Sequence, residues 1–483
     1  MGLNERVTPH SASKLAEEIH IAAERKMWDD IVRNLHAKAP NEACAFVLTV
    51  PSRGVKRATV IMRRVLWPTS GEVQATPFSL EISADYISRV MDEAVDAGPL
   101  VGVCLIHTHP ASDRGPGKGS FSPRDDWYEK RLFPTLTLGR KEAIAASLVL
   151  GSEGDVDGRI WWEGTEGVEM QRAHAVRIVG SRLEIIETPS SAWTDHTDPK
   201  VMDRSTRLWG KEGRRRLQNL RVGIPGAGGT GSLSLFALAT MGVGKLEVWD
   251  KDIATKENRH RTAGVTASRV GIPKVRALEA LAHEVRTAAP FEIEVHEDWA
   301  TTEEGLRQLK DCDILFCCVD RFAPRVALND LAYAHLIPTL DMASWLHRND
   351  RKEVDALMTH AQVWSPGMPC AWCRGTLSSY KLMREAQGRQ QAIEKRIPYG
   401  LPLEETEGAE PSVLPLNMLG VSLALMEFMQ VALGITTRTP RDLKFTLPEW
   451  ELDENDLVTN IGCDCESNIA AGDTLAIRPI LLV

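Results

Sequence analysis

The sequence predicts an α/β protein with two domains, a mixed α/β domain followed by a doubly wound and mostly parallel sheet. Its 483 residues are enough for two large domains. Its composition, 43% hydrophobic and 25% charged, is ordinary for a globular chain. Between Glu187 and Pro199, a stretch rich in Pro, Ser, Thr and Asp shows no apolar period. We interpret residues 191–199 as the linker between a domain at residues 1–190 and one at residues 200–483.

The first domain mixes strand and helix patterns along the chain. Ala43–Val50 and Val101–His107 are short apolar runs of strand length. In Ala84–Ala97 the apolar residues recur at helical spacing. Strands and helices without a regular alternation predict a mixed α/β domain.

The second domain alternates between the two kinds of element, which predicts a parallel sheet covered on both faces. The expected elements, in chain order, are Leu220–Ile224 (strand), Ser232–Met241 (helix), Lys245–Trp249 (strand), Lys274–Val285 (helix) and Ile314–Val319 (strand). A loose segment at residues 386–411 starts basic and ends acidic. We interpret it as a crossover loop, and a solvated surface loop without a role fits it equally well.

Charge and hydropathy exclude several classes of function. The net charge of −9 argues against a large basic surface for nucleic acids. Met1–Arg25 contains no apolar run, so a secretory signal is not expected. The most apolar stretch, Val413–Leu433, contains Pro415, Glu427 and Gln430, so we expect a buried helix and no membrane span. The expectation is a cytoplasmic protein with reduced cysteines.

Two histidines mark the first candidate site. His107 and His109 end an apolar run, and residues two apart on a strand point to the same side. A catalytic zinc takes three protein ligands from imidazoles and carboxylates, and Asp125 is the candidate third ligand. Glu42 precedes another apolar run and is the candidate base for a zinc-activated water. Taken alone, Ser122–Asp125 is also an ordinary helix start, and an isolated His-x-His is more often structural.

These residues resemble the JAMM/MPN (JAB) metalloproteases, whose pattern is a Glu opening an apolar strand, then His-Ser/Thr-His-Pro, then Ser-x-x-Asp. The resemblance covers roughly residues 25–185 and implies a cytidine-deaminase-like fold. It implies cleavage of peptide or isopeptide bonds after the tail of a ubiquitin-like protein. The loop Ser112–Ser120 is longer than usual and is expected to shape the substrate groove or act as a lid. A degenerate domain without metal is the alternative. The implied roles are zinc ligand for His107, His109 and Asp125, general base for Glu42 and oxyanion stabilisation for Ser122.

A glycine-rich turn marks the second candidate site. Gly226, Gly228, Gly229 and Gly231 lie between an expected strand and an expected helix. Glycines let the backbone approach a phosphate, and the helix N-terminus supplies free N–H groups. Asp250 ends the next strand, where a carboxylate can bind ribose hydroxyls. These features alone also fit an NAD-dependent oxidoreductase.

Charged residues further along the chain favour a triphosphate over NAD. Arg261 and Lys274 suit phosphate groups. Asp320 ends an apolar strand and suits Mg²⁺, which proteins usually bind through few carboxylates together with the phosphates of the substrate. Hydride transfer needs no such combination of charges, so we expect ATP and Mg²⁺.

This half resembles the ThiF/MoeB-type adenylyltransferases, relatives of the ubiquitin-activating enzymes. The strings that carry the resemblance are Asp203–Gly210, Gly226–Ser232, Asp250–Arg261, Gly271–Lys274 and Cys318–Asp320. They imply a Rossmann-like fold, a homodimer and adenylation of the C-terminal glycine of a ubiquitin-like protein. The implied ATP and Mg²⁺ residues are Gly226, Gly228, Gly229, Gly231, Asp250 (ribose), Asp252, Asn258, Arg261, Lys274 and Asp320 (Mg²⁺), and Arg204 or Arg207 would reach the partner subunit's ATP site.

Two close cysteine pairs predict a closed, structural zinc site of four thiolates. The same family resemblance implies such a site, and reduced buried thiols are the alternative. Residues 386–411 contain no cysteine, although a thioester-forming nucleophile would be expected there. We therefore expect the acyl group to pass to a thiol elsewhere, or directly to a nucleophile. The four expected zinc ligands are Cys370, Cys373, Cys463 and Cys465.

Together the two sites predict a bifunctional enzyme of a bacterial ubiquitin-like pathway. Zinc-dependent hydrolysis would process or deconjugate the ubiquitin-like protein, and adenylation would activate its C-terminus. The expected partners are that protein, a second copy of the chain and a conjugating-enzyme-like protein, with no nucleic acid and no membrane. The alternatives are activation of a sulfur carrier for cofactor biosynthesis, a non-catalytic dimeric scaffold and an NAD-dependent oxidoreductase.

Overall fold

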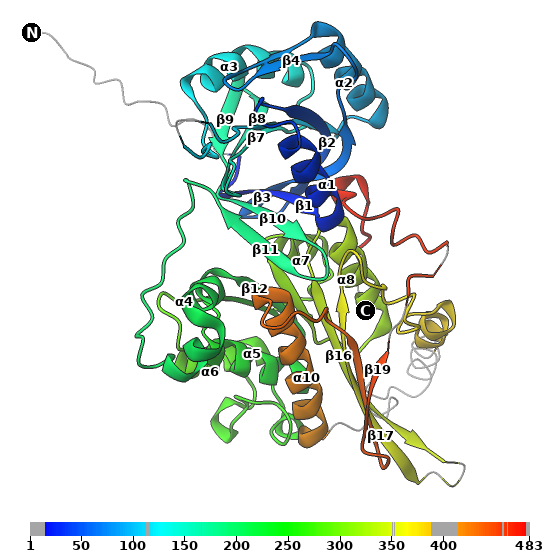
Figure 1. Cartoon of the computed structure of the whole chain (residues 1–483). Helices are drawn as coiled ribbons and strands as arrows, with labels where there is room; N and C mark the ends of the chain where they lie inside the picture. The colour runs from blue at the N-terminus through cyan, green and yellow to red at the C-terminus, as the bar shows by residue number, and fades with distance from the viewer. Residues whose placement is uncertain are drawn as a thin grey trace, which may run out of the picture. The chain divides into compact units, whose positions relative to one another are not determined.

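The computed structural model describes residues 15–112, 115–165, 167–349, 351, 353–387, 413–455, 458–460 and 462–479 (Figure 1). The predicted crossover loop at 386–411 therefore lies almost entirely outside the described residues. The chain forms two compact units. The first contains residues 1–22, 27–176 and 186–191, and the second contains residues 23–26, 177–185 and 192–483.

A nine-stranded mixed sheet carries the first candidate site. Its order is β11 (Leu183–Glu187), β10 (Ala175–Val179), β1 (Glu18–Glu24), β3 (Arg57–Leu66), β2 (Cys44–Arg53), β6 (Gly102–Thr108), β7 (Ala145–Leu150), β8 (Val156–Gly164) and β9 (Gly167–Arg172). Strand β6 pairs antiparallel with β2 and parallel with β7, as a mixed sheet requires. The remaining elements are the hairpin of β4 (Val73–Thr76) and β5 (Ser79–Ile82) and the helices α1 (Arg25–His36), α2 (Ala84–Ala97) and α3 (Pro123–Thr137).

The predicted strands of the first domain are its central ones. Ala43–Val50 lies largely in β2, Val101–His107 in β6 and Ala84–Ala97 forms α2, so these three predictions are confirmed. Every residue of β6 is buried, as is β2 from its start to Ser52. Strands buried on both faces read as continuous apolar runs, which is why the sequence located these two well. The end of β6 carries His107, one of the candidate ligands.

An eight-stranded sheet forms the frame of the second unit. Its order is β14 (Glu292–His296), β13 (Lys245–Trp249), β12 (Arg221–Pro225), β15 (Ile314–Cys317), β16 (Thr339–Arg348), β17 (Val354–Trp364), β18 (Asp442–Leu447) and β19 (Glu451–Asn455). The first five strands are parallel, and the last three pairings are antiparallel. The helices are α4 (Asp203–Asn219), α5 (Gly229–Met241), α6 (Lys274–Val285), α7 (Glu303–Leu309), α8 (Phe322–Ala334) and α10 (Leu414–Leu433), with short 3-10 turns at Lys256–Asn258, Ala267–Arg269 and Gly472–Thr474.

The strand order reverses beside β12, which is where a doubly wound sheet is expected to form a crevice. After β12 the chain continues to β13 on one side, whereas β15 pairs with β12 on the other side. In doubly wound sheets, ligands bind outside the carboxyl ends of the strands at such a reversal of order. The glycine-rich turn follows β12 directly, and Asp320 follows β15.

Helix α10 packs along β16 and β17 and beside α5, and Figure 1 shows it (orange) running next to these elements. Its close approach is visible at Gly420, where an added Cβ would lie 2.4 Å from Oγ1 of Thr359. Within the part of the chain that the structure describes, α10 is the one helix long and apolar enough to cross a membrane, and 50% of its most apolar window is buried inside the protein.

Candidate functional site

The first candidate site lies at the end of β6. His107 and Thr108 close this strand and His109 follows it. Pairing of His107 with Cys44 of β2 on one side and with Val149 of β7 on the other fixes the position of the strand end. The two imidazole rings lie 5.2 Å apart between their centroids.

Asp125 joins the two histidines. Nε2 of His107 lies 3.3 Å from Oδ1 of Asp125, and Nε2 of His109 lies 3.5 Å from its Oδ2. Ligand atoms about 2.0–2.2 Å from one tetrahedral zinc ion are about 3.3–3.6 Å from each other. Nε2 of His107 is buried and makes no hydrogen bond of acceptable geometry to the described residues. Both observations, and the set of two imidazoles and one carboxylate, fit zinc with a fourth position open.

The helix start at Ser122 presents Asp125 to the histidines. Ser122 caps α3: its Oγ accepts a hydrogen bond from the Asp125 N–H at 3.3 Å, and its own N–H donates to Oδ2 of Asp125 at 2.6 Å. Asp125 is therefore both part of an ordinary helix start and the candidate third ligand. Burial alone would raise the pKa of Asp125, but the nearby imidazoles of His107 and His109 outweigh it and hold this pKa well below its ordinary value. Asp125 is ionised, as a metal ligand must be.

Glu42 faces the three candidate ligands from the residues before β2. Its N–H donates to the carbonyl of Thr76 at 2.9 Å. Burial raises the pKa of the Glu42 carboxyl, and the nearby charges of His107 and His109 partly oppose this effect. A half-buried carboxyl beside the ligands is suited to accept and release a proton.

His109 has a second partner besides Asp125. Its Nδ1 lies 2.9 Å from the carbonyl oxygen of Lys118. Burial alone would lower the pKa of His109, but its interactions with Asp125 and then with the Lys118 carbonyl raise it. The ring is thus held at both nitrogens.

The four predicted cysteine ligands converge in the second unit. The sulfur atom of Cys370 lies 3.6 Å from the sulfur atoms of both Cys373 and Cys463. The sulfur atom of Cys373 lies 3.9 Å from that of Cys465. Sulfur atoms about 2.3 Å from one tetrahedral zinc ion are about 3.8 Å apart. All four cysteines are free thiols. The backbone N–H of Asn460 also donates to the sulfur of Cys373 at 3.3 Å. These distances fit a structural zinc ion.

The glycine-rich turn between β12 and α5 is tightly wound. Gly226 has a φ of +100°, in the region that favours glycine. An added Cβ at Gly231 would lie 1.8 Å from the carbonyl oxygen of Gly226. Beyond the turn, Oδ2 of Asp250 accepts a hydrogen bond from the N–H of Ala227 at 2.8 Å. The end of β13 is thereby connected to the turn, as a nucleotide site at this crevice requires.

Lys274 and Asp252 adjoin Asp250. Nζ of Lys274 lies 2.7 Å from Oδ2 of Asp252 and 3.9 Å from Oδ1 of Asp250. Burial raises the pKa of Asp250, and the Lys274 charge partly opposes it. Asn258 ends a short 3-10 turn and accepts a hydrogen bond from the N–H of Thr255 at 2.9 Å, while Nη1 of Arg261 donates to the Glu257 carbonyl at 3.2 Å. The structure thus gathers Asp250, Asp252 and Lys274, and it ties the side chains of Asn258 and Arg261 to their own turn.

Asp320 is exposed just beyond β15. The carbonyl oxygen of Cys318, two residues earlier, would lie 2.6 Å from a Cβ at Gly226. The segment that ends in Asp320 therefore packs against the glycine-rich turn. A carboxylate at this position suits a Mg²⁺ ion that shares the phosphates of a nucleotide.

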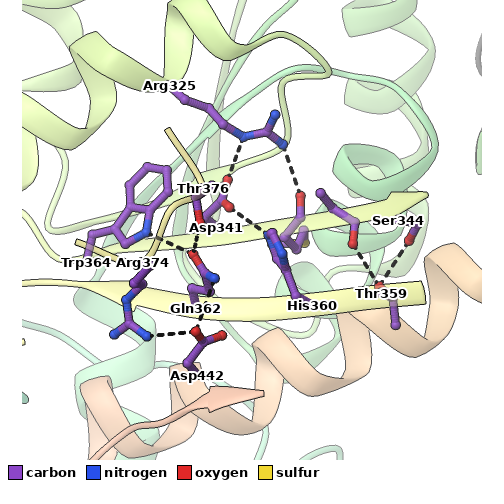
Figure 2. Close-up of polar contacts among 12 residues, drawn as sticks. Arg325, Asp341, Ser344, Thr359, His360, Gln362, Trp364, Arg374, Thr376 and Asp442 are labelled. Carbon is purple, nitrogen blue, oxygen red and sulfur yellow. Dashed lines mark hydrogen bonds and ion pairs between the residues drawn. The ribbon is translucent and has the colours of Figure 1, made fainter. Parts of the chain in front are cut away.

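A buried ion pair, which the sequence pattern did not reveal, lies beside this segment. Nε of Arg325 on α8 donates to Oδ1 of Asp341 on β16 at 2.9 Å. Nε2 of His360 on β17 donates to Oδ2 of the same carboxylate at 2.9 Å. Figure 2 shows both side chains pointing to Asp341 from opposite sides. The signal available in the sequence was Asp341 itself, a carboxylate within an apolar strand, because a buried carboxylate needs partners that satisfy it.

Asn417 is a second residue that sequence reasoning missed. It lies in the first turn of α10, and its Nδ2 would be 2.4 Å from a Cβ at Gly229. It therefore lies against the glycine-rich turn although 188 positions separate Asn417 from Gly229.

Arg204 and Arg207 lie on the exposed first turns of α4, where Arg207 forms an ion pair with Asp203 at 2.8 Å. Their expected role in a partner subunit remains a prediction.

Cys317 and Cys318 are buried at the end of β15. Burial raises the pKa of the Cys318 thiol to about 12 and raises that of Cys317 well above its ordinary value. A buried thiol with a raised pKa is a poor nucleophile because little thiolate forms at neutral pH.

Two protein-family models match parts of this chain. The model of the ThiF family matches residues 202–449, just over half of the chain, and the model of prokaryotic homologues of the JAB domain matches residues 24–163. The SAMP-activating enzyme E1 of Haloferax volcanii is 32% identical over 130 residues, which are 27% of this chain and 47% of that protein. The adenylyltransferase and sulfurtransferase MOCS3 of Anopheles gambiae is 32% identical over 121 residues, 25% of this chain and 27% of that protein.

The matches thus span less than half the length of these relatives. Among solved structures, the E. coli MccB complex with succinimide covers 56% of this chain and 76% of its own, with 14% identity and a TM-score of 0.43. The JAB-domain match contains β2, β3, β6, β7 and both histidines, and the ThiF match contains β12 to β18 and the glycine-rich turn. The chain belongs to the ThiF family and joins a ThiF adenylyltransferase domain to an N-terminal JAB domain.

Proposed function

We propose that the second domain adenylates the C-terminal glycine of a ubiquitin-like protein. The observation that carries the proposal is the convergence, at one crevice, of the glycine-rich turn, the Asp250–Asp252–Lys274 cluster and the segment ending in Asp320. The names of two relatives, an activating enzyme E1 and an adenylyltransferase and sulfurtransferase, support the same substrate class. The preferred pathway is conjugation, and activation of a sulfur carrier is the second candidate because a sulfur carrier protein adenylyltransferase of Thermus thermophilus is 34% identical over 127 residues.

The proposed reaction is an exchange of one oxygen–phosphorus bond for another. A carboxylate oxygen of the glycine attacks the α-phosphorus of ATP, and the bond to the bridging oxygen of pyrophosphate breaks. Lys274 and the N-terminus of α5 would hold the phosphates, Asp250 the ribose and Asp320 a Mg²⁺ ion, which supplies positive charge to the leaving pyrophosphate when bound. Catalysis would consist of positioning and charge neutralisation.

The acyl group of the adenylate would then pass to a nucleophile outside the described residues of this domain, and AMP would leave. Cys317 and Cys318 are buried with raised pKa values, which disfavours a thioester on either. The expected acceptor is a thiol of a conjugating-enzyme-like protein or another external nucleophile. Since Arg204 and Arg207 project from exposed turns of α4, we further propose a homodimer in which one of them reaches the partner's ATP.

Pyrophosphate release tests the adenylation proposal. The full-length chain is incubated with ATP, Mg²⁺ and a ubiquitin-like protein that ends in glycine. Asp320→Ala should abolish release and Lys274→Ala should reduce it strongly, whereas Lys251→Ala, an exposed neighbour, should not change it. Equal release by wild type and Asp320→Ala would refute the assignment. ATP but not NAD should raise the melting temperature, which also tests the oxidoreductase alternative.

We propose for the first domain a zinc-dependent cleavage of the peptide or isopeptide bond after the same tail. A zinc ion held by His107, His109 and Asp125 would supply Lewis acidity for the scissile carbonyl and for water. Glu42 would take the proton from the attacking water and return it to the leaving amine. The Ser122 hydroxyl would donate a hydrogen bond to the oxyanion.

Replacement of the base tests this second activity. Glu42→Gln keeps the size of the side chain but cannot accept the proton, so cleavage of a tailed precursor should fall by 10²-fold or more, roughly the worth of a general base. Glu81→Gln, an exposed carboxylate on β5, is the matched control. Unchanged cleavage in Glu42→Gln would reject the assignment. Absence of both activities from the wild-type chain would favour the scaffold alternative.

A further inference from the structure

The residues around His109 assign a role to the long loop Ser112–Ser120. The described end of this loop, Gly117–Gly119, is not free to open as a lid. The N–H of Gly117 donates to Oγ of Ser152 at 3.0 Å, and the carbonyl of Gly117 accepts from the N–H of Ser152 at 2.8 Å. One residue beyond Lys118, the N–H of Gly119 donates to Oδ2 of Asp155 at 2.6 Å. The turn between β7 and β8 thus fixes the loop on both sides of Lys118.

Backbone passes so closely at these points that only glycine fits. A Cβ at Gly117 would lie 2.0 Å from the carbonyl oxygen of His109. A Cβ at Gly119 would lie 2.1 Å from the carbonyl oxygen of Asp155. Both neighbouring atoms belong to backbone and cannot rotate away. The segment is therefore enclosed between the residues after β6 and the β7–β8 turn.

This enclosed segment points one carbonyl at the metal site. The Lys118 oxygen lies 2.9 Å from Nδ1 of His109. A carbonyl oxygen only accepts hydrogen bonds, so Nδ1 carries the proton, and in the neutral imidazole Nε2 then carries the lone pair. Nε2 is the atom that lies 3.5 Å from Asp125. The loop thereby selects the tautomer in which His109 can bind a metal through Nε2.

We propose that Asp155 and the Gly117–Gly119 segment form a positioning device that fixes the tautomer and orientation of His109 for metal binding. The inference rests on the metal site of the proposed function and extends it beyond the three ligands and the base. Asp155 touches neither ion nor substrate and acts through Gly119, then Lys118, then His109. Replacing a residue that holds a metal-binding histidine in place typically lowers metal affinity about 10- to 100-fold.

Zinc affinity of the full-length protein, measured by competition with a chelator, tests the proposal. Replacing zinc by Co²⁺ separates the two sites, because four thiolates give intense sulfur-to-metal bands that a histidine–carboxylate site lacks. Asp155→Ala should weaken binding at the histidine site by about 10- to 100-fold and leave the four-cysteine site unchanged. The matched control is Glu153→Ala, which removes a likewise exposed carboxylate from the same turn. It should leave both affinities unchanged.

A second readout needs no metal. In the metal-free protein, nitrogen chemical shifts of His109 should report the Nδ1-protonated tautomer in wild type and Glu153→Ala, and a mixture of tautomers in Asp155→Ala. Unchanged affinity and an unchanged tautomer in Asp155→Ala would overturn the positioning role while the metal site stands. Absence of metal binding at the histidines in wild type would instead overturn the proposed metal site, and this inference with it.

Discussion

Removing the charge of Asp341 is expected to destabilise the second domain strongly. The carboxylate is fully buried and accepts hydrogen bonds from Arg325 and His360, each at 2.9 Å (Figure 2). Asp341→Asn leaves the buried Arg325 guanidinium without its counter-charge. Breaking a buried pair in this way costs about 3–5 kcal/mol. At about 2–4 °C per kcal/mol, the melting temperature of the domain should fall by roughly 6–20 °C.

The antiparallel pair of β16 and β17, which carries Asp341 and His360, also offers a matched control. His347 and Asp355 also form a His–Asp pair, at 2.7 Å, but their side chains are 64% and 42% exposed. Exposed pairs contribute about 0–1 kcal/mol, so Asp355→Asn should shift the melting temperature by no more than a few degrees. Calorimetry or urea denaturation of the full chain measures both variants. Equal, small shifts for the two variants would refute the reasoning that burial makes the Asp341 pair costly to break.

The pH dependence of this effect follows from the pKa of Asp341. Burial alone would raise it, but the Arg325 charge and the His360 hydrogen bond outweigh burial and hold this pKa well below its ordinary value. A carboxyl with a lowered pKa stabilises the fold above its unfolded pKa of about 3.9 and loses that contribution as the pH falls through the folded pKa. The stability gap between wild type and Asp341→Asn should therefore be constant near neutral pH and narrow below about pH 4. A gap that widens on acidification would contradict the assignment.

Three further outcomes are expected. Zinc analysis of the purified chain should give two ions, and Cys370→Ser should remove one of them and lower the melting temperature; a count unchanged in this variant would exclude the four-cysteine site. Gly231→Ala should abolish the rise in melting temperature that ATP causes, because its Cβ would meet the Gly226 carbonyl at 1.8 Å, and an undiminished rise would show that the turn does not bind ATP. In the native protein, Cys317 and Cys318 should resist alkylation at neutral pH and carry no thioester after turnover, as mass spectrometry can check.

The sequence predicted the elements whose patterns depend on local physics. Ala84–Ala97 and Lys274–Val285 are helices with the predicted bounds, because apolar spacing marks the face that packs on the sheet. The strands β2, β6 and β13 are buried centrally and read as apolar runs. The antiparallel β16–β19 were not predicted, since the alternation of strand and helix ends before them.

The candidate ligands could be predicted, but their supporting residues could not. Spacing on one strand brought His107 and His109 to one side, and the helix start brought Asp125 to them. Asp155 and Asn417 reach their sites through tertiary packing between distant segments. No local pattern encodes such contacts, because they depend on how turns and helices from elsewhere in the chain are placed.

One diffraction experiment probes the account as a whole. Crystals grown with zinc, ATP and Mg²⁺ would be measured at the zinc absorption edge. We expect one anomalous peak among His107, His109 and Asp125, a second among the four cysteines, and triphosphate density over the glycine-rich turn with an ion at Asp320. Featureless density at the histidines and at the turn, in a protein that is otherwise folded as described, would contradict it.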